Sequence, residues 1–161
     1  MKIVEINSSN YPIVAQIYQE GIETGMATFE EIVPDWHVWS NNHLPYGNIA
    51  LEVQNELVAW ASLAPTSKRS AYRGVAEVSV YVSKMHQNKG YGKGLLHELI
   101  AISEKNGIWT LQAGIMRENE VSIKLHKKCG FREIGYREKI AKLKGVWRDN
   151  ILLERRSPIL I

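Results

Sequence analysis

Hydrophobic and polar positions follow two different periods along the first part of the chain. Residues 2–6 alternate apolar and polar side chains as a strand does, whereas apolar positions over 13–22 recur at helical spacing. A second helix is predicted to begin at Pro34-Asp35, and the segment Pro45–Gly47 ends it. This part of the chain therefore predicts one strand followed by two helices.

The remaining apolar runs predict further strands and helices. Residues 49–53 and 57–63 flank a short polar turn and indicate a β-hairpin, and a polar loop then leads to a strand over 74–82. The second half predicts a helix ending near Asn106, a strand over 108–115, a helix that opens at 118–122 and ends before Gly130, and a hairpin of strands 131–143 and 146–153. The pattern indicates a mixed α/β (α+β) protein, and 161 residues suit a single domain spanning 1–161.

Composition and charge exclude several classes of protein. The chain is 45% hydrophobic and 23% charged, which is ordinary for a folded globular protein, and its formal charge of +3 demands no polyanion-binding face. Lysines and arginines are dispersed and no groove-reading motif is present, so we expect no nucleic-acid partner. No apolar run approaches the ~20 residues of a membrane span, so we expect no membrane insertion and a cytoplasmic location.

A metal or disulfide site is not predicted either. Cys129 is the single cysteine, which excludes an internal disulfide and a cysteine-based zinc site. We interpret it as a small residue that fills the end of a helix rather than as a catalytic thiol. The histidines at 37, 43, 86 and 97 have no metal-ligand spacing, so surface or packing roles are expected for them.

The segment Gln87–Leu96, entered from a strand-like run, indicates a strand, a phosphate loop and a helix. Gly90, Gly92 and Gly94 remove Cβ atoms where the backbone must turn, and the N–H groups at a helix start bind phosphate anions. The glycines alternate, unlike those of the dinucleotide-binding G-x-G-x-x-G or of the Walker loop. We therefore expect a pyrophosphate ligand, whereas hydride transfer and nucleotide hydrolysis are disfavoured.

Several motifs together resemble the GNAT superfamily of acyl-CoA N-acyltransferases, over essentially the whole chain. They are Gln87-x-x-Gly90-x-Gly92, the preceding strand Val80-Tyr81-Val82 and the later Leu125-His126-x-x-x-Gly130-Phe131. Within that superfamily the chain resembles the phosphinothricin acetyltransferase group, through Ile22-Glu23-Thr24, Trp60-Ala61, Ala76-Glu77-x-Ser79-Val80-Tyr81-Val82 and Gly145-x-Trp147-x-Asp149.

The resemblance implies a GNAT fold and acetyl-CoA as the acyl donor. The fold is a mixed, mostly antiparallel sheet that is splayed between the strands over 74–82 and 108–115, with helices on both faces. Backbone groups of Val80, Tyr81 and Val82 would meet the pantetheine arm, and Gln87, Asn88, Lys89, Gly90, Tyr91, Gly92 and Lys93 would surround the pyrophosphate. Asn119 and Lys128 are further expected cofactor contacts, with a helix cap as the alternative for Asn119.

Acyl transfer to an ammonium group needs a base, and the resembling group has a glutamate at Glu77. About five residues separate it from Val82, roughly 16 Å along a strand, so one strand can connect the phosphate loop to the thioester. Glu77 is expected to take the ammonium proton, directly or through water. A solvated strand residue is the alternative interpretation. A backbone N–H near Val82 is the expected donor to the thioester oxygen.

The departing thiolate must also be protonated, and here the motif has His126 where many GNAT enzymes have tyrosine. Imidazole donates a proton near neutral pH, so His126 is the expected general acid. The alternative is a residue of the helix surface.

The acceptor pocket is expected to contain Phe29 and the loop residues Ser70, Ala71, Tyr72 and Arg73. The resemblance places substrate contacts in this loop, and arginine grips a carboxylate with two parallel hydrogen bonds. A solvated basic loop is the alternative. The resemblance also implies a homodimer, closed near the hairpin turn at Gly145–Asp149.

With the resemblance taken into account, three function classes remain open. The first is an acetyltransferase that acts on the amino group of a small amino-acid-like compound, such as phosphinothricin or methionine sulfoximine. The second is an acetyltransferase for a peptide or protein N-terminus, or for a polyamine. The third is an acyl-CoA-binding regulatory module without turnover, against which an intact Glu77 and His126 argue.

Overall fold

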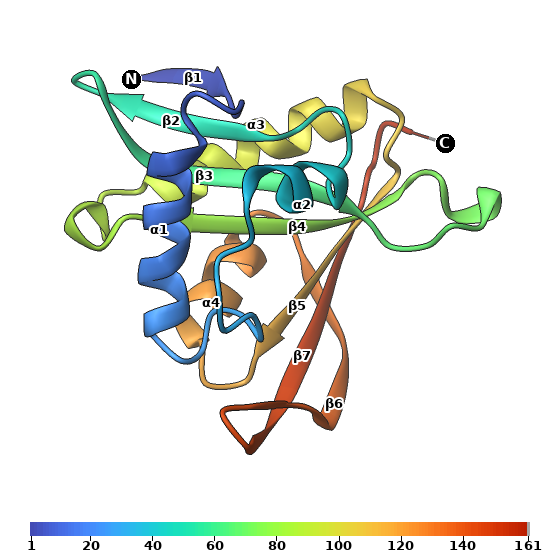
Figure 1. Cartoon of the computed structure of the whole chain (residues 1–161). Helices are drawn as coiled ribbons and strands as arrows, with labels where there is room; N and C mark the ends of the chain where they lie inside the picture. Colours follow the sequence, from blue (N-terminus) through green and yellow to red (C-terminus); the bar gives the residue numbers. More distant parts are fainter. Residues whose placement is uncertain (161) are drawn as a thin grey trace.

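A single open sheet of seven strands organises residues 1–160, which are the residues that this computed structural model describes (Figure 1). Ile161 of the predicted domain lies outside them. The strands are β1 (Lys2–Glu5), β2 (Ile49–Val53), β3 (Glu56–Pro65), β4 (Val75–Val82), β5 (Thr110–Met116), β6 (Arg132–Leu143) and β7 (Val146–Arg156), in the spatial order β1-β2-β3-β4-β5-β7-β6. The helices are α1 (Tyr11–Glu23), α2 (Trp36–Asn41), α3 (Tyr91–Lys105) and α4 (Glu120–Lys128), with short 3₁₀ turns at Ser70–Tyr72 and Lys84–His86.

The sheet opens between its two central strands. All neighbouring strands are antiparallel except β4 and β5, which run parallel and pair only at Val75–Thr110, Ala76–Leu111 and Glu77–Gln112. Beyond Glu77 the two strands diverge, as Figure 1 shows, while β4 stays paired with β3 as far as Val82. The predicted fold, a mostly antiparallel sheet splayed in the middle, is confirmed.

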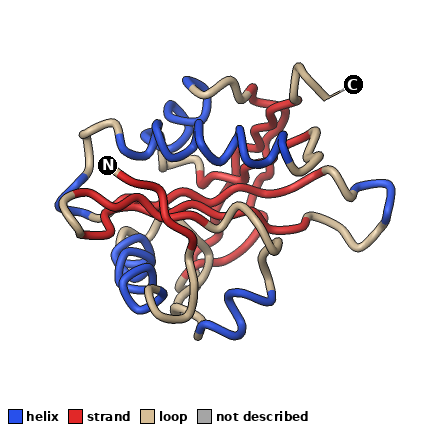
Figure 2. The backbone as a smooth tube through the Cα atoms, turned by 90° about the horizontal axis from the view of Figure 1, so that it is seen from above, coloured by secondary structure: helices blue, strands red, loops and turns tan. Residues whose placement is uncertain are grey.

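Helices cover both faces of the sheet (Figure 2). On one face, α3 packs the apolar stripe Leu95, Leu96 and Leu99 against the sheet. On the other face, α1 and α2 enclose an aromatic cluster that includes Trp39 and Trp60. The two cores bury the apolar side of each helix, which is the main source of stability for such layers.

Successive side chains of β4 point to opposite faces of the sheet, so alternation decides which of the two cores each one joins. Ala76 and Val78 belong to the core beneath α3, whereas Tyr81 packs with the cluster beneath α1. Because side chains alternate along a strand, Glu77 lies on the same face as Tyr81. Gly21 of α1 fits closely over this face, since a Cβ there would lie 2.5 Å from the Tyr81 ring.

Local chemistry explains most element boundaries. Gln54 and Asn55 adopt φ of 52° and 65°, and Lys144 and Gly145 adopt 48° and 78°, so both predicted hairpins close through left-handed residues. The second helix is shorter than the pattern predicted, because it ends at Asn41 and Leu44 instead donates its N–H to the Leu63 carbonyl of β3 (2.8 Å).

No helix among residues 1–160 is long and apolar enough to cross a membrane.

Candidate active site

A cleft of ≈ 1580 Å³ lies where β4 and β5 part. Its walls come from distant parts of the sequence: α1 and the loop after it, β4, the start of α3, β5, α4 and the last hairpin. One end lies at the glycine-rich start of α3, and the floor runs along β4 to Glu77. The gap between the two central strands therefore forms a cleft that runs from the start of α3 to Glu77.

The glycine-rich end of the cleft has the backbone geometry of an anion site. Asn88 and Gly90 adopt left-handed φ of 61° and 80°, and Gly90 is the N-cap of α3. The first N–H groups of a helix have no partner within it, so those of α3 are available at this end. Gly92 has a separate role, since a Cβ there would lie 3.3 Å from Val82 Cγ2 and 3.4 Å from Leu125 Cδ2.

The middle of the cleft follows the unpaired side of β4. Val80, Tyr81 and Val82 pair with β3 on one side, at Ala61, Trp60 and Ala59, and have no strand partner on the side toward β5. Backbone N–H and C=O groups that point into such a gap must find other hydrogen-bond partners. An extended ligand that carries amide groups fits this edge as an additional strand would.

The helix α4 forms the opposite wall of the cleft, to which it contributes Asn119 and His126. Asn119 caps the helix, because its side-chain oxygen accepts the Ser122 N–H (3.2 Å), and its amide donates to the Met26 carbonyl (3.4 Å). The capping alternative for Asn119 is therefore what this structure contains. The residue also lines the cleft, so capping and ligand contact are compatible.

His126 is a buried neutral imidazole rather than a surface residue. Its side chain is 3% exposed, and its ring meets Phe131 edge-on at 5.1 Å. Nδ1 lies 2.8 Å from the Ser122 carbonyl, which can only accept, so Nδ1 carries the proton and Nε2 keeps its lone pair. Burial lowers the pKa of His126 below its usual value, and the Ser122 contact offsets only part of this shift.

The far end of the cleft holds a carboxylate and an aromatic wall. Glu77 is solvent-accessible and lies beside Gln112 at the last pair before the strands part. Desolvation by the surrounding protein raises the pKa of Glu77, and the charge of Arg137 lowers it, with a net upward shift. Tyr81 forms the wall, and it stacks on the buried Trp60 at 4.5 Å. This end can accept a proton.

Comparison with known proteins agrees with this geometry. The model of the Acetyltransferase (GNAT) family matches residues 6–131. This chain belongs to the GNAT family of acetyltransferases. Among its curated relatives, the phosphinothricin N-acetyltransferase of Alcaligenes faecalis is 31% identical over 159 residues, covering 93% of this chain and 79% of the relative. The L-methionine sulfoximine/L-methionine sulfone acetyltransferase of Pseudomonas aeruginosa is 27% identical over 147 residues, covering 88% and 86%.

Solved GNAT structures superpose over nearly the whole chain. The ribosomal-protein-alanine N-acetyltransferase of Brucella melitensis has a TM-score of 0.90 at 28% identity and covers 98% of this chain and 100% of its own. The phosphinothricin acetyltransferase of Sinorhizobium meliloti, solved in complex with acetyl-CoA, has a TM-score of 0.87 at 25% identity and covers 96% and 87%. The predicted family and the phosphinothricin acetyltransferase-like group are confirmed.

Most residues predicted for the GNAT site do meet in one cleft. Those that line it are Phe29, Glu77, Val80, Tyr81, Val82, Gln87, Asn88, Gly90, Tyr91, Gly92, Lys93, Asn119, His126 and Lys128. Lys89 belongs to the same loop and is exposed, but it does not line the cleft. Trp60 of the motif Trp60-Ala61 is buried in the core beneath Tyr81.

The loop predicted to contact the acceptor lies elsewhere in this chain. Ser70, Ala71 and Tyr72 form an exposed 3₁₀ turn, and the Arg73 guanidinium lies 5.4 Å from the Trp109 ring centroid, outside the cleft. The physical reason is that β3 and β4 pair as far as Pro65–Ala76, so their connection projects past the closed end of the sheet. Within one chain, these residues are not brought together with Glu77.

The structure adds cleft residues that the sequence patterns did not single out. Gln112 of β5, Asn150 of β7 and Arg137 of β6 all line the cleft, and Gln112 is the strand partner of Glu77. In the sequence, Gln112 could have been recognised as a candidate because it is a polar residue within an apolar strand. The placement of Arg137 depends on a bulge in β6, where the pairing shifts between Arg137 and Ala141, so alternation along the hairpin could not locate it.

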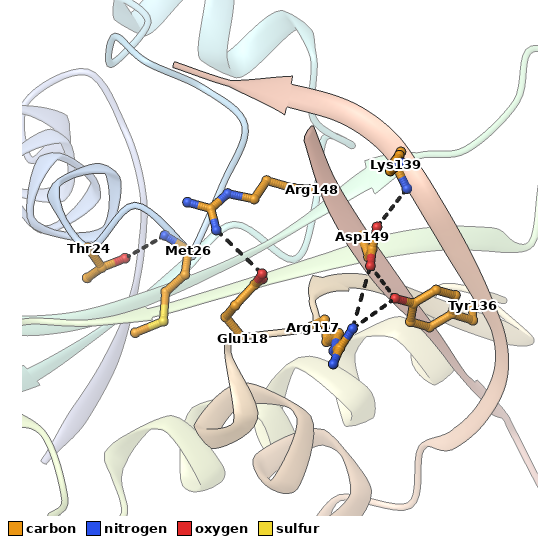
Figure 3. A network of polar contacts seen from close by, with 8 residues as sticks. All are labelled: Thr24, Met26, Arg117, Glu118, Tyr136, Lys139, Arg148 and Asp149. Carbon is orange, nitrogen blue, oxygen red and sulfur yellow. Dashed lines mark hydrogen bonds and ion pairs between the residues drawn. The ribbon is translucent and has the colours of Figure 1, made fainter. Parts of the chain in front are cut away.

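A polar network anchors the last hairpin beside the cleft (Figure 3). Asp149 accepts hydrogen bonds from the Tyr136 hydroxyl and the Lys139 N–H (2.7 Å) and pairs with Arg117 (3.8 Å). The hydrogen bond from Tyr136, followed by the one from Lys139, holds the pKa of Asp149 below its usual value. Asp149 of the motif Gly145-x-Trp147-x-Asp149 thus has a structural role, because it fixes the hairpin bulge.

Proposed function

We propose that this GNAT acetyltransferase transfers the acetyl group of acetyl-CoA to the amino group of a small amino-acid-like acceptor, of the phosphinothricin or methionine sulfoximine type. The main support for this proposal is the cleft, which runs along the unpaired side of β4 from the start of α3, a site suited to an anion, to Glu77. The names of the Alcaligenes and Pseudomonas relatives support the acceptor class.

The donor is assigned to the part of the cleft nearest α3. The residues proposed for the pyrophosphate are Gln87, Asn88, Lys89, Gly90, Tyr91, Gly92 and Lys93, whose backbone N–H groups and lysine charges suit a polyanion. The open edge at Val80, Tyr81 and Val82 suits the amide-bearing pantetheine arm. Asn119 and Lys128 are proposed further contacts on the α4 wall.

Glu77 is the proposed general base. Its raised pKa keeps the carboxylate a better proton acceptor than an ordinary glutamate, so it can take one proton from the acceptor ammonium. The neutral nitrogen then attacks the thioester carbonyl, the C–N bond forms and the C–S bond breaks. A backbone N–H near Val82 stabilises the carbonyl oxygen. A second proton leaves the nitrogen and neutralises the departing sulfur, which completes the proton balance.

The geometry of His126 argues against its predicted role as general acid. A neutral imidazole that donates its Nδ1–H to Ser122 offers only a lone pair at Nε2, and burial opposes a second proton. Direct or water-mediated transfer from the attacking nitrogen to sulfur therefore replaces His126 as the proton source in this proposal. His126 remains a wall residue that can accept a hydrogen bond.

The experiment is thiol release from acetyl-CoA with a panel of acceptors: phosphinothricin, methionine sulfoximine, ordinary amino acids, polyamines and short peptides. The proposal expects turnover with the amino-acid-like compounds and little with polyamines. Turnover confined to peptides would favour the second candidate, a protein N-terminal acetyltransferase, which the similarity to the Brucella ribosomal-protein-alanine enzyme supports. Binding of acetyl-CoA without turnover on any acceptor would favour the regulatory module.

A homodimer in the cytoplasm completes the proposal. The last hairpin exposes several large apolar side chains, which are Ile134, Tyr136, Ile140, Val146 and Trp147. Exposed apolar groups that gather on one hairpin are typical of an interaction surface. Light scattering coupled to size exclusion tests the dimer, and a monomeric mass at micromolar concentration would contradict it.

A further inference from the structure

Arg137 lies on the same face of the sheet as Glu77. The strand pairings show which residues share this face. Glu77 of β4 pairs with Gln112 of β5. Met116 lies four residues further along β5, so it faces the same side, and it pairs with Asn150 of β7. Asn150 in turn lies beside Arg137 of β6. Because neighbouring pairs in a sheet share a face, Glu77, Asn150 and Arg137 all project into the α1 side of the cleft, which all three line.

The guanidinium of Arg137 has no partner of its own among residues 1–160. Arg132, on the same face of β6, is neutralised by an ion pair with Glu154, whereas Arg137 forms neither an ion pair nor a hydrogen bond. Its charge nevertheless reaches Glu77, whose pKa it lowers. Arg137 is therefore a cation in the same cleft as the proposed base, and it is free to bind a ligand.

Asn150, the cross-strand neighbour of Arg137, presents a second unsatisfied group in the cleft. Its Oδ1 is buried and, within residues 1–160, has no hydrogen-bond donor. Buried acceptors are normally paired, because burying one without a partner is costly. A ligand with a positively charged N–H donor would satisfy this oxygen, while its anionic group would suit Arg137.

We propose that Arg137 binds the carboxylate of the acceptor, that Asn150 Oδ1 accepts a hydrogen bond from its ammonium group, and that Glu77 takes the ammonium proton through water. This inference rests on the proposed function and narrows the substrate class to free α-amino acids and their analogues, in which one carbon separates the two groups. A guanidinium grips a carboxylate with two parallel hydrogen bonds. A peptide N-terminus has an uncharged amide in place of the carboxylate, and a polyamine offers only cations, which Arg137 repels.

The test compares L-methionine sulfoximine with its carboxamide, which lacks the negative charge, as acceptors for the wild type, Arg137→Gln and Arg137→Lys. Lys139→Gln is the matched control: it removes a cation from the same strand, outside the cleft lining, and keeps the backbone N–H that Asp149 accepts. The full-length protein is used, and equal melting temperatures check that each variant folds.

For the wild type we expect kcat/KM to be roughly ten- to a hundredfold higher for the acid than for the carboxamide. Arg137→Gln should remove that preference by raising the KM for the acid, with the KM for acetyl-CoA unchanged. Arg137→Lys should restore part of the preference, and Lys139→Gln should keep all of it.

Two results would overturn the inference while leaving the proposed function intact: a wild type that acetylates acid and carboxamide equally, or an Arg137→Gln variant that loses both activities in the same proportion. A wild type that acetylates peptides but neither form of the amino acid would overturn the proposed function itself.

Discussion

The left-handed glycine at the start of α3 gives a prediction that can be worked from the backbone. Gly90 adopts φ +80°, and nothing lies within 4 Å of the place where its Cβ would be. Gly94 lies one turn further along α3, with ordinary helical backbone and equally open space. Substituting alanine at the two positions therefore separates the effect of backbone strain from the effect of a new methyl group.

The two substitutions should change stability in opposite directions. Gly90→Ala forces an L-residue into the left-handed region at a cost of roughly 1–2 kcal/mol. Gly94→Ala gains about 0.5–1 kcal/mol, because alanine loses less backbone entropy in a helix. In a chain of this size, about 1 kcal/mol corresponds to about 2–4 °C in Tm, so Gly90→Ala should melt several degrees lower and Gly94→Ala slightly higher.

Thermal unfolding followed by circular dichroism measures both changes, and calorimetric titration with coenzyme A measures the consequence for the site. Gly90→Ala should weaken coenzyme A binding, because the loop must shift to relieve the strain, and Gly94→Ala should not. If Gly90→Ala were as stable as Gly94→Ala and bound coenzyme A as tightly, the left-handed turn would not be what positions the phosphate-binding N–H groups.

Three further predictions follow from titratable groups. His126→Gln should leave both limbs of the pH profile of kcat/KM in place, because the imidazole is already neutral near pH 7; loss of the alkaline limb would restore its role as general acid. Arg137→Gln should move the acidic limb to higher pH, because the cation that lowers the pKa of Glu77 is gone, and an unmoved limb would contradict their coupling. Burial acts to raise the pKa of Glu104, but hydrogen bonds, chiefly from Arg155, hold the pKa below its usual value. This carboxylate should therefore stabilise the fold above the ordinary carboxyl range, and the stabilisation should be lost as pH falls through the lowered pKa. Denaturant unfolding at several pH values measures the effect, and Glu104→Gln should remove the pH dependence.

The fold was predictable because its signals are local. The alternation over 2–6 and 74–82, the helical stripe at Leu95, Leu96 and Leu99, and the left-handed turn residues each specify one element without reference to the rest of the chain. The glycine loop likewise combines a turn and a helix start within a few residues. The glycine-rich end of the cleft, which is the proposed donor site, could therefore be located from sequence.

The acceptor end depends on how distant strands align, and sequence patterns do not supply that alignment. Arg73 follows a polar loop directly before β4, and the sequence alone favours it as the carboxylate ligand. Because β3 and β4 pair over a long stretch, Arg73 lies away from the cleft. Arg137 reaches the cleft through the register of three strand pairs and a bulge. For His126, the motif gave the position, but the Ser122 contact that fixes its proton became visible only in three dimensions.

We propose that acetyl transfer takes place in the splayed cleft with Glu77 as the base. The most direct test is the pH dependence of kcat/KM for L-methionine sulfoximine in the wild type and Glu77→Gln, with the KM for acetyl-CoA measured alongside. For Glu77→Gln we expect a loss of roughly a hundredfold or more in kcat/KM, with the acidic limb abolished and acetyl-CoA binding retained. Unchanged turnover in Glu77→Gln across the pH range would contradict it.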